Sequence, residues 1–555
     1  MAVVALHRRR HFQHRILQIK KTWALLSLEQ QGRYLTCPAP IKITIKKMKN
    51  LAMLHESLIP FVAKKTGSQL LWHNELSPAE QDELKNEASY LIEENNRHAI
   101  FDDGTPLLND EKVFFAERYG GGAISRNGGG ARCGFDGRWQ VKGIGANALV
   151  GQGAKHVDGE LTMTGAVLEA LWGNVMAKLL PYGAVPNKAI LLTDNPIATL
   201  SPASAGDVHN RKALLVREPV VRPAHFCRAP YYHPHDAMQR QPSDIERTEK
   251  LIVAAPSFLP RPSEFDAVRW LALPQEERAF YGLCELARRL ATQIAYCRTR
   301  HLVMMTSPSN CDMAGRLLDF HGVRSVFPAE RRDPGRSYIQ HNKLNEDAPL
   351  LLRGMQDLAF YLAKHQFGPA FLAAAHQGIG AAFSMAYKRA CLLDNLGMAG
   401  FAPAFLQRLP LTAEWFALGE RLQKMFDLAP GVFSRRQGLG QGNAHPAIAL
   451  LHRLIDSPVR VSAEQQGTTA EEKFSLAFQR LYAKYLQETS ADQTAAGLQQ
   501  AMKQTVTRRL GSRAFMRREV IFQEIAGWRG EVSEISEQLQ TYLDRFERQA
   551  INVLQ

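Results

Sequence analysis

The sequence predicts an α+β protein with two lobes, a small β-rich lobe that carries one helix and a helical lobe that follows it. Three observations support this prediction. Strand-like runs dominate before residue 233, helical periodicity dominates after residue 262, and polar, proline-bearing segments at 233–243 and 256–262 lie between them. With 555 residues the chain exceeds one ordinary core, so two or three packed units are expected.

The strands and helices follow one another in a clear order. The predicted strands are Arg138–Lys142, Lys188–Thr193 and Ala213–Val216, and a helix at Met163–Leu180 lies among them. The helices predicted after the crossing are Glu276–Tyr296, Pro349–Lys364, Pro369–Asn395 and Glu414–Phe426. A small sheet with one inserted helix and then a helical lobe is the order expected of a bilobed protein-kinase-like fold.

Five regions are expected along the chain. Residues 1–47 form a basic segment, and 48–108 a helical extension that opens with a helix at Met48–Val62. Residues 109–258 form the β-rich lobe and 259–440 the helical lobe. A glycine-rich joint at 431–446 leads into a C-terminal helical region at 441–555.

The last predicted helix carries an apolar seam at alternating spacings of three and four residues. The seam consists of Val532, Ile535, Leu539, Tyr542, Phe546, Ala550 and Val553. It could serve a partner protein or pack within its own chain. Packing within the chain is favoured, because three heptads alone are a weak coiled-coil signal.

The net charge of +14 is concentrated at the N-terminal end. Residues 1–47 contain ten lysines and arginines and one acid, Glu29, which amounts to a net +9. Nucleic-acid binders carry their positive charge on a folded face, so this distribution disfavours a nucleic-acid role. The segment is interpreted as a basic arm for membrane or RNA, as a transit peptide, or as disordered or non-native residues before a translation start at Met48.

Cysteine usage and hydropathy point to the cytoplasm. The seven cysteines are scattered and include no Cys-x-x-Cys pair, which argues against a disulfide framework and a zinc ribbon. The most apolar stretch, Phe371–Ala386, is interrupted by His376, Gln377 and Ser384, so no membrane span is predicted.

A glycine-rich segment at Tyr119–Arg132 is the first candidate for ligand binding. It holds six glycines in eleven residues, and backbone of this kind can bend tightly and bring N–H groups against an anion. Gly128, Gly129 and Gly130 are the predicted phosphate-binding positions. Alone the segment also fits a flexible loop, since it matches neither of the common phosphate-loop motifs.

A lysine and a glutamate follow at positions that suit phosphate chemistry. Lys142 ends a predicted strand and precedes Gly143 and Gly145, so its ammonium group could reach phosphates. Glu169 lies on the following helix among apolar residues, where an acid needs a partner. The alternative is that Lys142 and Glu169 are unrelated surface charges.

Two arginines stand just beyond the strand that ends at Val216. Arg217 and Arg222 could clamp a polyphosphate, because guanidinium groups bind phosphate in a bidentate manner and keep their charge. A solvated strand end is the alternative.

The segment from His301 to Gly322 contains candidate metal ligands. Asn310 stands in a loop, and a short strand after it ends in Asp319, within an Asp-Phe-x-Gly motif. Mg²⁺ prefers a few protein oxygens completed by phosphate oxygens, which a carboxylate and an amide can supply. The motif alone is short enough to occur by accident.

In order and spacing these blocks resemble the SelO (YdiU) family of pseudokinase-like protein adenylyltransferases. The separations from Asn310 to Gly315 and to Asp319 match without gaps, and the resemblance covers about 250 of the 555 residues. The matching blocks are Tyr119–Arg132, Val141–Gly145, Val167–Pro186, Val216–Phe226, His301–Gly322 and Gly335–Ala359.

The resemblance implies a Mg–ATP site. ATP would lie reversed relative to ordinary kinases, so that AMP rather than phosphate passes to a protein or peptide hydroxyl. The residues implied in these contacts are Lys142, Arg217 and Arg222 for the phosphates, Glu169 for orienting Lys142, and Asn310 and Asp319 for Mg²⁺ or Mn²⁺.

Departures from the family pattern affect catalysis more than binding. Ser309 stands where the family has the aspartate implied as general base, and a hydroxyl without an adjacent base is a poor proton acceptor. Asp312 is the remaining catalytic candidate, on condition that the loop is rearranged. The family's C-terminal Cys-x-x-Cys or selenocysteine ending is also absent.

A divergent branch offers a second interpretation. The chain is similar in length and in its reduced motif set to the MchC/MceJ-like maturation proteins of siderophore-bearing microcins. That similarity implies a subunit that helps attach a glycosylated siderophore to a peptide's C-terminal serine, with an acyltransferase-like partner docked on the C-terminal helices.

Two other site types receive little support. His225, Cys227, His233, His235 and Asp236 lie close in sequence, but their irregular spacing matches no zinc pattern. A Ser-His-Asp hydrolase is disfavoured because the sequence has no Gly-x-Ser-x-Gly elbow.

Overall fold

The computed structural model describes residues 51–102, 104–121, 126–154, 157–197, 208–235, 241, 243–328, 341–428, 445–458, 465, 467–489 and 494–555. The predicted basic segment 1–47, the Met48 start and residues 431–444 of the glycine-rich joint at 431–446 lie outside these residues. The described residues form two compact units, 51–387 together with 512–555, and 388–511. Both α-helices and an antiparallel β-sheet are present, as expected for an α+β chain.

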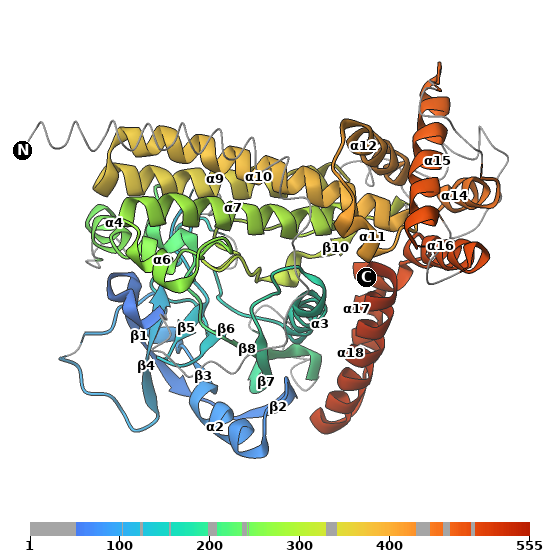
Figure 1. Cartoon of the computed structure of the whole chain (residues 1–555). Coiled ribbons are helices and arrows are strands. Elements are labelled where there is room, and N and C mark those ends of the chain that lie inside the picture. The colour runs from blue at the N-terminus through green and yellow to red at the C-terminus, as the bar shows by residue number, and fades with distance from the viewer. Residues whose placement is uncertain are drawn as a thin grey trace, which may run out of the picture. The chain divides into compact units, whose positions relative to one another are not determined.

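An eight-stranded antiparallel sheet forms one part of the first unit, in the order β2-β7-β8-β6-β5-β4-β1-β3 (Figure 1). Only Thr66 and Gly67 join β1 to β2, although five strands separate these two in the sheet. So short a link requires the sheet to curl until its two edges approach each other. The strands are β1 Leu58–Lys65, β2 Ser68–His73, β3 Tyr90–Leu91, β4 Glu111–Glu117, β5 Cys133–Phe135, β6 Gln140–Lys142, β7 Asn187–Pro196 and β8 Arg211–Arg217.

The predicted helical extension at 48–108 needs correction, because strands occupy much of it. In β1 the buried side chains are Ile59, Phe61 and Ala63, which repeat every two residues as a strand requires. The expected helix at Met48–Val62 was therefore wrong for the part that β1 occupies. The region also contains α2 (Pro78–Ala88), where Ser77 and Glu80 form a capping box, and short 3₁₀ turns at Leu51–Met53, His55–Ser57 and Glu94–Asn96.

The predicted helix among the strands is α3 (Met163–Leu179), and it covers one face of the sheet. The Thr162 side chain caps its first turn by accepting the N–H of Gly165. Leu215 and Ile190 of the sheet lie in the same core as α3. Residues of the opposite face, such as Phe114, form a second core with Leu84 of α2.

Helices dominate the remainder of the first unit, as predicted. In α7 the buried residues Leu283, Leu286, Leu290 and Ile294 repeat at helical spacing, and α7 packs against α9 (Figure 1). A small sheet pairs β9 (Leu302–Val303) with β10 (Arg324–Ser325). The helices are α4 Asp244–Ile252, α5 Ala255–Phe258, α6 Ala267–Ala272, α7 Gln275–Thr299, α9 Asp347–Leu362 and α10 Pro369–Met398, with a π-helical turn at Ala363–Phe367.

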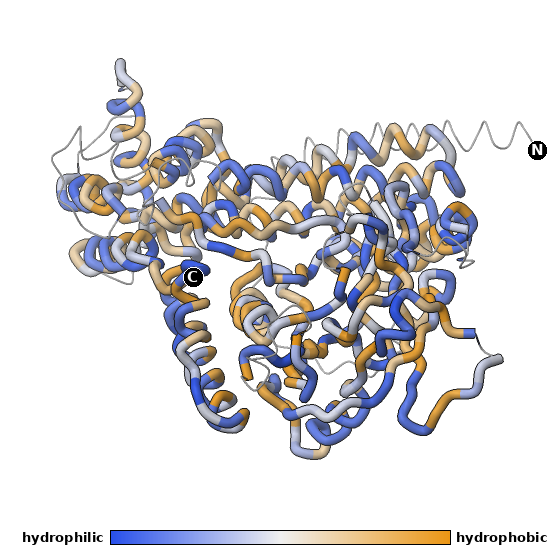
Figure 2. The backbone as a smooth tube through the Cα atoms, turned by 180° about the vertical axis from the view of Figure 1, so that it is seen from behind, coloured by the Kyte–Doolittle hydropathy of each residue, from blue (hydrophilic) through white to orange (hydrophobic). Residues whose placement is uncertain are grey.

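The C-terminal helices α17 (Arg518–Gly527) and α18 (Val532–Leu554) belong to the first unit. The predicted region 441–555 is thus divided, since its last part returns to the core formed by residues 51–387. Apolar and polar residues alternate along α18 (Figure 2). Six of the seven seam residues are buried in that core, so the expectation that the seam packs within its own chain is confirmed.

The second unit is helical. Phe401, Phe405, Phe478 and Tyr485 form an aromatic cluster at its centre. Its helices beyond the end of α10 are α11 Pro403–Arg408, α12 Ala413–Asp427, α14 Ala447–Asp456, α15 Ala470–Thr489 and α16 Ala495–Arg509. In the described part of the chain, no helix combines the length and the apolar character that a membrane crossing needs.

Candidate functional site

Lys142, Glu169 and Asp319 meet within the first unit. Lys142 is the last residue of β6, Glu169 lies in the second turn of α3, and Asp319 follows the hairpin after β9. The Lys142 Nζ lies 2.5 Å from Glu169 Oε2 and 2.8 Å from Asp319 Oδ1. Lys142 and Asp319, which are 177 positions apart in sequence, are therefore in direct contact. The same ammonium group also binds Glu169.

The second oxygen of Glu169 binds Arg217. Its Oε1 lies 3.1 Å from Arg217 Nη1, and Arg217 Nε donates to the side-chain oxygen of Gln140. Lys142, Glu169 and Arg217 are all buried, where an isolated charge would be costly. Two cations and the carboxylates of Glu169 and Asp319 offset one another, so the cluster can stay charged away from water.

Asp319 is the exposed end of this cluster. Its backbone has φ +67°, in the left-handed region, and its side chain is 30% exposed. Burial alone would raise the pKa of Asp319, but the positive charges of Lys142, Arg217 and Arg132 outweigh it and hold the pKa well below the ordinary value. The carboxylate is consequently ionised at neutral pH.

A tight hairpin places Asn310 opposite Leu318, the residue before Asp319. The carbonyl of Asn310 accepts the N–H of Leu318 at 3.0 Å, and Cys311 pairs with Leu317. The side-chain amide of Asn310 is half-buried and makes no hydrogen bond to the residues that the structure describes. The predicted metal ligands thus come from adjacent strands of one hairpin.

The described residues contain no group of three His, Cys, Asp or Glu side chains arranged to hold a metal ion. A hard cation at Asn310 and Asp319 would have two protein oxygens and would take the others from water or a ligand. Mg²⁺ binds in this manner when it accompanies phosphates. The donor set therefore fits a cation that arrives with a phosphate-bearing ligand.

Arg222 contacts groups on both sides of the site. Its Nη1 donates to the carbonyl of Ser309, its Nε lies 3.7 Å from Glu117 Oε2, and its guanidinium covers the ring of Tyr119 at 4.9 Å. His225 Nε2 lies 3.4 Å from the same Glu117 oxygen. Arg222 is only 2% exposed, and it connects the glycine-rich segment to the loop of Asn310.

The described glycines of the glycine-rich segment are held by backbone contacts. Gly128 N–H donates to Leu149 at 2.9 Å, and Gly130 N–H donates to Glu117 at 2.8 Å. Gly129 has φ +146°, and an added Cβ would lie 2.1 Å from the Glu117 carbonyl oxygen, so only glycine fits there. Residues 122–125 of this segment lie outside the described residues.

Ser309 and Asp312 are both engaged within their own loop. Ser309 Oγ lies 2.7 Å from Ser307 Oγ. Asp312 Oδ2 lies 2.6 Å from Arg316 Nε, and its Oδ1 accepts the backbone N–H groups of Ala314 and Arg316. To act as a base, Asp312 would have to give up these contacts.

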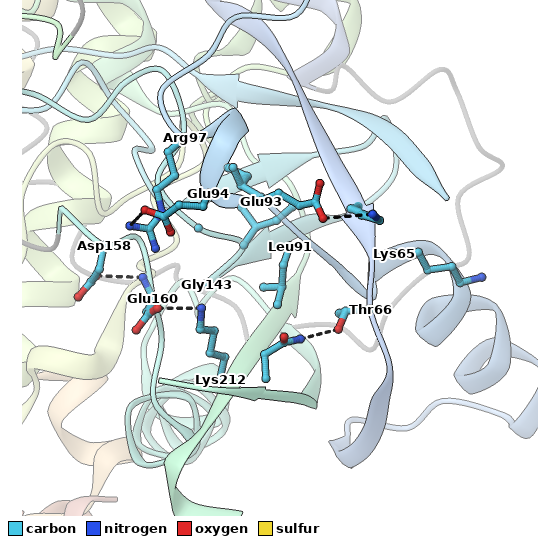
Figure 3. Close-up of a pocket in the computed structure, with 15 residues that line it drawn as sticks. Lys65, Thr66, Leu91, Glu93, Glu94, Arg97, Gly143, Asp158, Glu160 and Lys212 are labelled. Carbon is cyan, nitrogen blue, oxygen red and sulfur yellow. Dashed lines mark hydrogen bonds and ion pairs between the residues drawn. The ribbon is translucent and has the colours of Figure 1, made fainter. Parts of the chain in front are cut away.

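A polar pocket of about 400 Å³ begins directly after Lys142 (Figure 3). Gly143 lines it, and several of the charged residues around it form ion pairs. Figure 3 shows Glu94 with Arg97 and Glu160 with Lys212, at 3.1 Å and 2.8 Å, whereas Lys65 points away. The backbone carbonyl of Glu160 accepts Arg132 Nη1 at 3.4 Å, which connects the pocket with the surroundings of Asp319.

No protein-family model and no curated protein matches this chain.

Sequence reasoning missed two groups at the site. Asp347 accepts the N–H groups of Met304 and Thr306, at 3.1 and 2.9 Å, and so holds the loop that leads to Asn310. Burial raises the pKa of Asp347 to about 6. Glu117 is the second, and burial opposes its ionisation while His225 and Arg222 lower its pKa. Neither residue belongs to a short motif, so long-range packing alone reveals them.

The His, Cys and Asp residues between positions 225 and 236 do not form a metal-binding group in the described part of the chain. His225 faces Glu117, and the Sγ of Cys227 lies 3.6 Å from the Pro223 carbonyl oxygen. The ring of His235 stacks on His98 with centroids 4.4 Å apart. Asp236 lies outside the described residues.

Proposed function

We propose that this protein binds Mg–ATP with a protein-kinase-like fold and transfers AMP to a hydroxyl group of a protein or peptide. The observation that carries the proposal is the contact of Lys142 with both Glu169 and Asp319. A strand lysine oriented by a helix glutamate, next to an aspartate that follows a loop asparagine, is the arrangement that protein kinases use for Mg-nucleotides. The sequence resemblance to the SelO family points to the same chemistry.

The chain's own residues fit a triphosphate with its cation. Lys142 keeps one N–H after its two carboxylate contacts, and it can direct this N–H to a phosphate oxygen. Asn310 and the exposed face of Asp319 offer the oxygens for Mg²⁺ or Mn²⁺, which would neutralise phosphate charge. Arg217 and Arg222 are proposed for the terminal phosphate. Because Gly128 and Gly130 already give their N–H groups to Leu149 and Glu117, the glycines 128–130 are proposed to shape the loop beside the phosphates rather than to bind them.

The proposed reaction is a displacement at the α-phosphorus. The acceptor hydroxyl oxygen forms a bond to that phosphorus, the bond to the bridging oxygen of the β-phosphate breaks, and pyrophosphate leaves. The hydroxyl proton passes to solvent water or, if Asp312 releases Arg316, to the Asp312 carboxylate. Ser309 stands at the expected base position and Asp312 is bound to Arg316, so positioning and charge stabilisation carry most of the proposed catalysis.

The test uses ATP labelled at either the α- or the γ-phosphate. The purified chain is incubated with each and with Mg²⁺, beside the variants Lys142→Met and Asp319→Asn. Label from the α-phosphate on protein, lost in both variants, supports AMP transfer. Label from the γ-phosphate alone would instead indicate an ordinary kinase.

A second candidate function rests on the loop around Ser309. Because neither Ser309 nor Asp312 is free to accept a proton, the chain could bind the nucleotide as a subunit of a peptide-maturation complex and need an acyltransferase-like partner for turnover. Tight Mg–ATP binding without labelling by either isotope, and labelling or product only after a partner is added, favours this role.

A further inference from the structure

Helix α18 lies against α3, the helix that carries Glu169. Trp172, one turn after Glu169, is fully buried, and its ring meets the edge of Phe546 at 5.4 Å and 84°. Near the end of α3, Lys178 forms an ion pair with Glu547. The chain's last helix therefore covers the side of α3 next to the Glu169 turn.

The end of α18 also touches the other half of the site. The carbonyl oxygen of Leu554 accepts Tyr296 Oη at 3.1 Å and Arg300 Nε at 2.6 Å. Arg300 directly precedes His301, where the loop that leads to Asn310 begins. Arg513, which precedes α17, also contacts this region, because its Nη1 donates to the Arg300 carbonyl at 2.5 Å. Residues 512–555 consequently contact the supports of both Glu169 and Asn310.

A small shift of α3 would break the cluster. Helices at packed interfaces move by about 1–2 Å in conformational transitions, and the Lys142–Glu169 contact is only 2.5 Å long. Glu169 is buried, so its carboxylate would lose Lys142 without gaining water, which is unfavourable. The position of α3 thus determines whether Lys142 is held for a ligand.

We propose that α18 is a clamp that sets the affinity of the site for Mg–ATP by holding α3, with Phe546 as its main positioning residue. This inference rests on the proposed function. Ligand and clamp then stabilise the same arrangement, and by reciprocity each should strengthen the other. A residue that merely filled the core would lower stability without linking α18 to the ligand.

The test combines hydrogen exchange with nucleotide titration on the full chain. Phe546→Leu keeps an apolar side chain but loses the edge contact to Trp172. We expect faster amide exchange in both α18 and α3, and an affinity for Mg–ATP at least about fivefold weaker. In the wild type, Mg–ATP should slow exchange in α18 as well as in α3.

The matched control is Arg545→Ala. Arg545 lies beside Phe546 on α18, but it pairs with Glu524 of α17 at 2.8 Å rather than with α3. This variant should leave nucleotide affinity and α3 exchange unchanged, whereas Glu547→Ala should shift both in the direction of Phe546→Leu.

Two results would overturn the clamp. One is faster exchange of α18 in Phe546→Leu with α3 unchanged, and the other is wild-type affinity in that variant although α3 exchanges faster. A wild-type chain that binds no Mg–ATP would refute the proposed function instead, and the exchange of α3 without nucleotide would still test the mechanical link.

Discussion

Glu169 gives one carboxylate oxygen to Lys142, at 2.5 Å, and the other to Arg217, at 3.1 Å. A single buried acid thereby orients two of the three cations proposed for the phosphates, Lys142 and Arg217. Replacing Glu169 should therefore disturb the positions of both Lys142 and Arg217. Replacing Lys142 or Arg217 should in turn disturb Glu169.

Lys142→Met should abolish Mg–ATP binding and lower stability. The substitution leaves Glu169 and Asp319 without their shared ammonium group, and breaking a buried ion pair from one side costs about 3–5 kcal/mol. Nucleotide titration and chemical unfolding measure the two effects. Lys85→Met, at an exposed position on α2, is the control and should change neither.

Asp319→Asn should reduce the loss of stability in acid. The pKa of Asp319 is lower in the folded protein than in the unfolded chain, so its contribution is fully present above the unfolded value of about 3.9. That contribution disappears as the pH falls, because the unfolded chain binds the proton first. Between pH 5 and 3 the free energy of unfolding should therefore fall less with decreasing pH in the variant than in the wild type. Equal slopes of free energy against pH would contradict the proposed charge environment of Asp319.

Asp347→Asn should change the pH dependence in the opposite direction. With a folded pKa of about 6, Asp347 binds a proton in the folded state more readily than in the unfolded one. Wild-type stability should thus fall relative to the variant as the pH rises from 4 to 6, by on the order of 2–3 kcal/mol. Denaturant unfolding across this range measures the difference between the two curves. A constant difference would show that folding does not raise the pKa of Asp347.

Arg222→Lys should weaken cation binding at Asn310 and Asp319. Lysine keeps the charge opposite Glu117 but lacks the planar fork that holds the Ser309 carbonyl. Losing one buried hydrogen bond costs about 1–3 kcal/mol. Titration with Mn²⁺ in the presence of ATP measures the effect. The exposed Arg269→Lys serves as control, and unchanged Mn²⁺ affinity in Arg222→Lys would argue that Arg222 does not support the loop.

Local signals in the sequence predicted that Glu169 pairs with Lys142 and that Asp319 belongs to the same site, whereas the direct contact of Lys142 with Asp319 was not predicted. Lys142 stands at a strand end, Glu169 on a helix among apolar neighbours, and Asp319 at the end of a short predicted strand. Glu117 and Asp347 have no such local signal, because their partners are backbone groups and distant side chains.

The strands before residue 74 were missed for a related reason. The apolar run that leads into β1 could be interpreted as a helix, since a short run does not distinguish the two periods. Its pairing with β4, in which Phe61 lies opposite Phe114, 53 residues later in the chain, favours the strand in the fold.

The first unit is built from both ends of the described chain, since residues 512–555 complete a core begun by residues 51–387. During synthesis, Trp172 must wait for Phe546, which emerges 374 residues later. A ribosome that stalls before the final helix would release a product with an uncovered apolar face on α3, a species prone to aggregation and to capture by chaperones. The exposed apolar face of α3 is therefore the physical difference between a chain that has not yet made α18 and one that has.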